Sequence, residues 1–314
     1  LTIFALGSTN PGDALTLTAF WAVILAFASA TQDIVVDALR IEMLDDEEQG
    51  SGAANFVNGY RVGMLASGAG ALVIADTYGW LWAYGSMSGL MFIGILVTLS
   101  LSEPNRRSSF IDYTNTWGSR FHIAVVEPFR EFSNRDNWIV ILVFVTLYKY
   151  GDALLGAMAN PFYADMGFSG TEIAVITKGW GLAMSLTGAV IGGILVARLG
   201  LLMALFVTGI GQLSGNLAFA WLAGYGQDLG ALTVAISVEN FTGAMATAAF
   251  VAYLSSLCHL QFTATQYALL TSLTAQARTF FTAGGLLAAV EILSRDVSGT
   301  SCRTYQCLLF ALLH

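Results

Sequence analysis

The sequence consists of long apolar runs separated by polar segments, most of them short. A run of about 20 apolar residues forms a helix that crosses the hydrocarbon core of a bilayer, which is about 30 Å thick. Eight runs reach this length, near residues 15–41, 54–75, 80–101, 138–160, 171–197, 200–223, 229–257 and 265–293. Because only helices and closed barrels satisfy their backbone groups in lipid, the pattern predicts an all-α membrane protein with eight complete spans.

The polar segments between these runs predict how the spans are connected. Most are short, such as ADTYGW at 75–80 and ARLG at 197–200, and short connections make neighbouring helices antiparallel. One is much longer, at residues 102–137. We therefore expect a partial N-terminal helical bundle at 1–101, a central loop at 102–137, a C-terminal helical bundle at 138–293 and an atypical tail at 294–314.

The orientation of the bundle is predicted from the cations outside the spans. Five arginines lie in the central loop, and the connections expected on the opposite side contain no Lys or Arg. The five are Arg106, Arg107, Arg120, Arg130 and Arg135. Because cytoplasmic loops carry the excess of Lys and Arg, we expect a multi-pass membrane protein whose central loop is cytoplasmic.

Three complete spans precede the central loop and five follow it. Two equal halves joined by a cytoplasmic loop are the usual plan of the major facilitator superfamily, whose halves are repeats. On that plan of twelve or more spans, the sequence predicts a truncated facilitator bundle. The tail at 294–314, with Cys302 and Cys307, is interpreted as a truncated or frameshifted end.

Composition supports this class and excludes several others. The chain is 56% hydrophobic and only 11% charged, against about 25% charged residues in a soluble domain. A net charge of −8 without a basic stripe argues against nucleic acid as a partner. Walker A, HExxH, CxxC and GxSxG motifs are all absent from the sequence, so we expect no metal, no cofactor and no enzyme.

Eight ionisable residues fall near the middle of predicted spans, where each costs at least about 2.5–3.5 kcal/mol to insert. The acids are Asp33, Asp37, Asp152 and Glu239, and the bases are Arg61, Lys149, Lys178 and Arg278. Structural pairing is one explanation, and Lys149 with Asp152, three residues apart, is the clearest local pair. So many charges also favour a water-filled cavity between two bundles, and hence a transport route.

These residue types suit the transport of a polar anion. Buried acids can take up and release protons, and Arg or Lys can hold anionic groups of a substrate. Tyr60 and Tyr150 adjoin charged positions, where aromatic faces could stack on sugar rings, although packing against lipid or other helices is the more common role of such residues.

Several motifs in the predicted spans are more specific than general facilitator features. They are SATQDIVVDALRIEML, EEQGSGAANFVNGYRVGMLASGAGAL, NWIVILVFVTLYKYGDAL, ITKGWGL, VENFTGAMATAAFVAYLSSLC and FTATQYALLTSLTAQAR. In this order, over about residues 15–293, they resemble the AmpG-type muropeptide permeases. The sequence departs from that family at both ends.

The resemblance implies a proton-coupled importer in the inner membrane of a Gram-negative bacterium. Its substrates would be anhydro-muropeptides, which are N-acetylglucosaminyl-1,6-anhydro-N-acetylmuramyl peptides, imported for peptidoglycan recycling and linked to β-lactamase induction. The implied proton-coupling residues are Asp33, Asp37, Asp152 and Glu239. The implied substrate-binding residues are Gln32, Tyr60, Arg61, Lys149, Tyr150, Lys178, Asn240, Gln266 and Arg278.

Two alternatives remain open on the sequence. A related facilitator could carry another bulky anion, such as acetyl-coenzyme A. An intramembrane aspartyl protease could use two buried acids, although YGD at 150–152 matches only part of the GxGD motif of that class.

Overall fold

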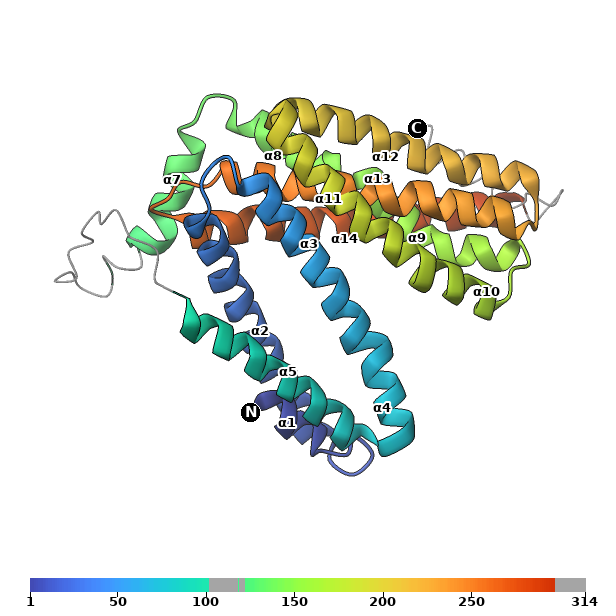
Figure 1. Cartoon of the computed structure of the whole chain (residues 1–314), viewed down its shortest axis with the longest axis horizontal. Helices are drawn as coiled ribbons and strands as arrows, with labels where there is room; N and C mark the ends of the chain where they lie inside the picture. Colours follow the sequence, from blue (N-terminus) through green and yellow to red (C-terminus); the bar gives the residue numbers. More distant parts are fainter. Residues whose placement is uncertain (102–117, 119–121, 297–314) are drawn as a thin grey trace. The chain divides into compact units, whose positions relative to one another are not determined.

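The computed structural model describes residues 1–101, 118 and 122–296, with side chains as far as residue 280 (Figure 1). Every regular element in these residues is a helix, which confirms the predicted all-α class. The predictions placed on Arg106, Arg107, Arg120 and on residues 297–314 of the tail lie outside the described residues.

Six helical segments in the described residues are long and apolar enough to cross a membrane. They are Leu15–Met43 (α2), Trp80–Ser100 (α5), Trp138–Asp165, Gly170–Leu199, Leu201–Tyr225 (α12) and Leu229–Ser256 (α13). The third is divided into α8 (Trp138–Tyr148) and α9 (Tyr150–Asp165). The fourth contains α10 (Gly170–Ala174), the π-helix η3 (Val175–Trp180) and α11 (Gly181–Leu199).

The other two predicted spans are also helical. The run at 54–75 is divided among α3 (Gln49–Leu65), the π-helix η1 (Ala66–Gly70) and α4 (Ala71–Tyr78). The sequence of η1, ASGAG, offers few helix-stabilising side chains, and π-turns of this kind occur inside otherwise regular helices. The run at 265–293 lies within α14 (Thr263–Asp296).

The described residues form two compact units. The first unit holds those of 1–43 and 59–113, and includes α1 (Thr2–Gly7), α2, α4 and α5. Helix α1 packs against α2 and α5. Gly7 lies so close to the side chain of Tyr84 that an added Cβ would overlap it. Helices α4 and α5 meet at Gly79, whose φ of +88° favours glycine.

The second unit holds residues 44–58 and the described residues of 114–314. Helix α13 is its centre, packed between α11 and α12 (Figure 1), and most of its residues from Thr242 to Ser255 are buried. Helix α14 packs against α8, α9 and α13. Helix α13 is therefore the element on which the polar groups of this unit can gather.

Small residues bring α11 and α13 close together. An added Cβ on Gly188 would overlap the carbonyl oxygen of Phe241, and one on Gly192 would lie 2.5 Å from the carbonyl oxygen of Met245. Small residues spaced in this way let two membrane helices approach at backbone distance.

The unit boundaries differ from the predicted domains. Residues 44–58 belong to the second unit because the small residues of α3 pack on α11: a Cβ on Gly50 would lie 2.9 Å from the Gly193 carbonyl oxygen, and Ala53 is fully buried. The predicted central loop also contains helical turns, η2 (His122–Val126) and α7 (Glu127–Ser133). Hydropathy alone does not detect either feature, since both depend on packing between distant segments.

Candidate functional site

Lys149 interrupts the third apolar segment, between α8 and α9, with a φ of −100° and a ψ of 8°. Its Nζ donates a hydrogen bond to Oδ2 of Asp152 at 2.5 Å and another to Oγ1 of Thr247 at 3.0 Å. The local pair predicted from the three-residue spacing therefore forms, and Thr247 ties it to α13. A cation 14% exposed at a helix break joins two helices through charge-assisted hydrogen bonds.

A second carboxylate lies beside this pair. Asp152 on α9 and Glu239 on α13 both approach the position where Gly243 carries no side chain. A Cβ added there would lie 3.5 Å from Oδ1 of Asp152 and 3.9 Å from Oε1 of Glu239. Two acids from different helices, both predicted as proton-coupling residues, are thus brought to one place.

Asn240 connects Glu239 to α11. Its Nδ2 donates to Oε2 of Glu239 at 2.8 Å and to the carbonyl oxygen of Ile236 at 3.0 Å. Its Oδ1 accepts from Oγ of Ser185 at 3.0 Å, and Ser185 is fully buried. Gly181 leaves the room for this amide, because a Cβ there would lie 3.2 Å from Nδ2 of Asn240.

We call these residues the central polar cluster. It consists of Lys149, Asp152, Ser185, Glu239, Asn240 and Thr247. A cation, two carboxylates, an amide and two hydroxyls can exchange protons and bind polar or anionic groups. Ser185 and Thr247 escape detection in the sequence, since hydroxyl residues are frequent in the apolar runs and usually bond to their own helix.

Tyr148 holds this part of α8 in place. Its hydroxyl lies 2.9 Å from Oγ1 of Thr208 and 3.2 Å from the carbonyl oxygen of Leu205 on α12. Its ring stacks on Phe250 of α13, with centroids 5.1 Å apart and planes 9° from parallel. The helix break at Lys149 is therefore fixed from both neighbouring helices.

The other residues predicted for the site in this unit lie on different elements. Tyr150 begins α9, directly after Lys149. Lys178 is exposed on η3, and Arg278 is exposed on α14. On η3, Nε1 of Trp180 donates to Oγ of Ser237 at 2.6 Å, which attaches the π-helix to α13.

The first unit carries the remaining predicted residues. On α2, Gln32 and Asp33 are exposed, whereas Asp37 lies 4.0 Å from Nε of Arg40. Of the charges predicted to share one face of this helix, Asp37 and Arg40 therefore form an ion pair. In the part of α3 that belongs to this unit, Tyr60 is 64% exposed and Arg61 is half-buried.

Gln266 lies in a separate network at the ends of the helices, and only 2% of the residue is exposed. Its Nε2 donates to Oε2 of Glu131 at 2.5 Å and to the carbonyl oxygen of Pro128 at 3.2 Å, and its Oε1 accepts from the backbone amide of His259 at 2.7 Å. The amide of Gln266 thus holds α7 and the α13–α14 connection together. Its assignment to substrate binding stays a prediction.

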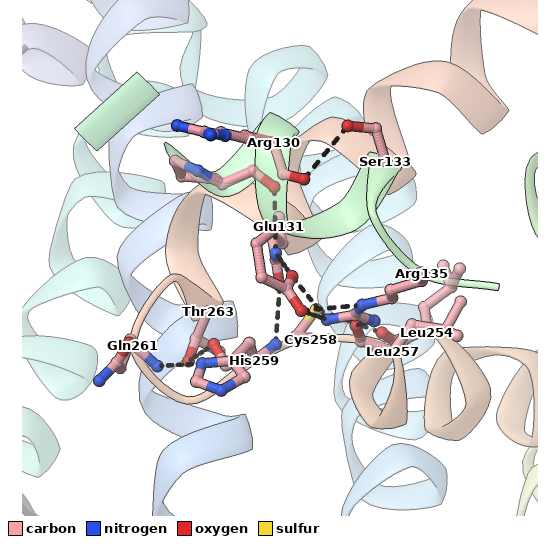
Figure 2. A network of polar contacts seen from close by, with 12 residues as sticks. Arg130, Glu131, Ser133, Arg135, Leu254, Leu257, Cys258, His259, Gln261 and Thr263 are labelled. Atoms are coloured by element: carbon pink, nitrogen blue, oxygen red, sulfur yellow. Dashed lines mark hydrogen bonds and ion pairs between the residues drawn. The ribbon is translucent and has the colours of Figure 1, made fainter. Parts of the chain in front are cut away.

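Arg135 completes this network (Figure 2). Its guanidinium binds the Glu131 carboxylate through both Nε at 3.0 Å and Nη2 at 2.7 Å, and its Nη1 donates to the carbonyl oxygen of Leu257 at 2.5 Å. The guanidinium also lies 5.3 Å from the ring centroid of Phe132. A bidentate arginine therefore joins α7 to the carboxyl end of α13.

The ionisation of Glu131 stabilises this network. Burial raises the pKa of its carboxyl, but hydrogen bonds from Arg135 and Gln266 and the Arg135 charge outweigh burial and hold the pKa below its usual 4.5. A carboxyl whose pKa is lower in the folded state adds stability above its unfolded pKa. That stability is lost as the pH falls below about 4.5 and through the lower folded-state pKa.

Arg135→Leu is expected to lower the stability of the purified protein by about 1–2 kcal/mol at neutral pH, because the variant loses hydrogen bonds to a charged and a carbonyl acceptor. Thermal unfolding in detergent, followed at several pH values, measures the effect. Arg130→Leu removes the same charge from an exposed position of α7 and is the control. The difference in unfolding midpoint between the two variants is expected to narrow below about pH 4.5, where Glu131 takes up a proton. Equal unfolding midpoints at neutral pH would contradict the role given to Arg135.

Comparison with known proteins places the chain in a family. Residues 1–288 match the Major Facilitator Superfamily. The chain is 40% identical over 273 residues to a Rickettsia conorii protein named as transporter AmpG 4, a match that covers 87% of this chain and 66% of the relative. It is 41% identical over 280 residues to the anhydromuropeptide permease of Escherichia coli K12, a match that covers 88% of this chain and 56% of the relative.

A third relative, named as transporter AmpG 3 of Rickettsia typhi, is 33% identical over 283 residues, which cover 89% of this chain and 67% of the relative. The chain spans less than two thirds of the length of the first two relatives. The described residues include six helical segments able to cross a membrane, and the chain is therefore a multi-pass protein of the bacterial inner membrane. As a member of a transporter family, it is not an enzyme. The chain belongs to the Major Facilitator Superfamily and, within it, to the AmpG-type permeases.

Proposed function

We propose that the protein imports anhydro-muropeptides across the inner membrane, driven by protons, for the recycling of peptidoglycan. The observation that carries this proposal is the central polar cluster within an apolar helical unit, because packing alone does not require it. The name of the Escherichia coli relative, an anhydromuropeptide permease, supplies the substrate class. Through the recycled muropeptides, the importer is linked to β-lactamase induction.

The chemistry of the proposed substrate agrees with the candidate residues. An anhydro-muropeptide carries two sugar rings, amide bonds and several carboxylates. Lys149 in the second unit and Arg61 in the first are the bases proposed to bind its carboxylates. The Asn240 side chain can exchange hydrogen bonds with amides, and the exposed ring of Tyr60 offers a stacking face for a sugar.

Protons are the proposed second partner. Each unit carries two of the four acids predicted for proton coupling, Asp33 and Asp37 in the first and Asp152 and Glu239 in the second. In a symporter, protonation and substrate binding favour the same conformational change, so that the site opens to one side of the membrane and then to the other. We place the central loop, with Arg130 and Arg135, on the cytoplasmic side.

Uptake of a labelled anhydro-muropeptide into right-side-out vesicles, prepared from a host without its own permease, tests this function. Unlabelled anhydro-muropeptide is expected to compete, and acetyl-coenzyme A is not. In a variant with Asp33→Asn and Asp37→Asn, we expect exchange of labelled for unlabelled substrate to persist while accumulation is lost. A variant that still builds a full gradient would contradict the proton-coupling role of these two acids.

A further inference from the structure

Gly243 lies in the middle of α13, where glycine costs about 1 kcal/mol relative to alanine. Its φ lies outside the left-handed region, so the backbone does not require glycine there. Packing does not require it either: an added Cβ would be in ordinary van der Waals contact, at 3.5 Å or more, with its nearest neighbours. Gly188 is different, since a Cβ there would overlap the backbone of α13.

The neighbours of that missing side chain are the two carboxylates of the central polar cluster. Asp152 binds Lys149 through Oδ2 and turns Oδ1 toward Gly243. Glu239 binds Asn240 through Oε2 and turns Oε1 toward Gly243. Each acid therefore uses one oxygen to hold its position and presents the other to the same small space.

Charged and titratable groups surround this pair. Lys149 lies at the break between α8 and α9, while Tyr148 and Tyr163 are close enough to interact electrostatically with Asp152 and Glu239, respectively. The other cations with described side chains on elements that pack against α13 are Lys178 on η3, Arg198 on α11 and Arg278 on α14, all of them exposed. Lys149 is thus hydrogen-bonded to Asp152, and Asp152 neighbours a second acid; neighbouring acids bind protons as a coupled unit.

We propose that Gly243 is a positioning residue for proton coupling: the space left by its missing side chain lets Asp152 and Glu239 share one proton through a water molecule. This inference rests on the proposed function of proton-driven uptake. Two carboxylates that face one site do not readily carry two negative charges, so the pair takes up one proton and releases the same proton later. The proton is bound and released without any other bond being made or broken.

Gly243→Ala fills this space with a methyl group and tests the proposal. We expect proton-driven accumulation to fall at least about tenfold, while exchange of labelled for unlabelled substrate continues. The pH dependence of uptake is expected to shift by about one pH unit or more, because a methyl group replaces water between the acids. Thermal stability should be unchanged or slightly higher, since alanine favours the helix. Gly243→Ser, whose hydroxyl can take the place of a water, is expected to retain more coupling than alanine.

Gly156→Ala is the matched control, because Gly156 lies in α9 and an added Cβ meets no atom of the described structure within 4 Å. Its accumulation and pH profile are expected to equal those of the wild type. Failure of the wild type to show uncoupler-sensitive uptake would refute the proposed function itself. If the wild type couples and Gly243→Ala couples equally well with the same pH profile, the inference about Gly243 is wrong.

Discussion

Replacing Lys149 with methionine is expected to abolish uptake and to lower stability by about 2–3 kcal/mol. The substitution keeps the length of the side chain but leaves the Asp152 carboxylate without the cation 2.5 Å away. An unpaired acid in a wholly buried site would cost about 3–5 kcal/mol. We expect less here, because 26% of the Asp152 side chain is exposed.

Thermal unfolding and vesicle uptake together measure this effect. A double variant with Lys149→Met and Asp152→Asn removes both charges, and should recover most of the lost stability without recovering uptake. Lys178→Met removes a cation from the exposed surface of η3 and should change stability by less than about 0.5 kcal/mol. A Lys149→Met protein with wild-type stability and uptake would show that the ion pair is dispensable.

Gly188→Ala is expected to reduce stability by about 3 kcal/mol or more, the largest structural effect among these variants. The added Cβ would overlap the carbonyl oxygen of Phe241, and a backbone atom in the centre of α13 has no free space to move into. Helices α11 and α13 would have to separate, which would also pull Ser185 away from Asn240.

Size-exclusion chromatography and thermal unfolding in detergent report on this change. Gly224→Ala is the control, since an added Cβ on Gly224 meets nothing within 4 Å among the described residues. The control should elute and unfold like the wild type. If Gly188→Ala does the same, the close approach of α11 and α13 does not limit stability.

Most of the fold follows from hydropathy, because the membrane restricts a long apolar run to a helix. The sequence predicts eight spans, and six described segments are long and apolar enough to cross a membrane. The π-helices η1 and η3 and the short α7 are not predictable in this way. They depend on local departures from regular hydrogen bonding and on contacts with segments far away in sequence.

The central polar cluster is only partly predictable from the sequence. The pairing of Lys149 with Asp152 follows from a three-residue spacing that places both side chains on one face of a helix. The meeting of Asp152 and Glu239 depends on how α9 packs on α13, which no local pattern encodes. Gly243 is not predictable from the sequence, because its proposed role depends on the carboxylates of Asp152 and Glu239, which the fold places beside it.

Gln266 shows that a polar residue in a predicted span can belong to a network at the helix ends. The resemblance to the permeases implies a role for Gln266 in substrate binding, yet its amide is buried between α7 and the α13–α14 connection. Its partners Pro128 and Glu131 lie more than a hundred residues away in sequence. A contact of this range becomes visible only in the folded chain.

The most direct test of the account is accumulation of labelled anhydro-muropeptide in right-side-out vesicles that contain this chain, measured with and without a proton uncoupler. We predict that the substrate accumulates above its external concentration and that the uncoupler abolishes the gradient. Vesicles with the chain that take up no more substrate than empty vesicles, or that keep the gradient when the uncoupler is present, would contradict the proposal of proton-driven import.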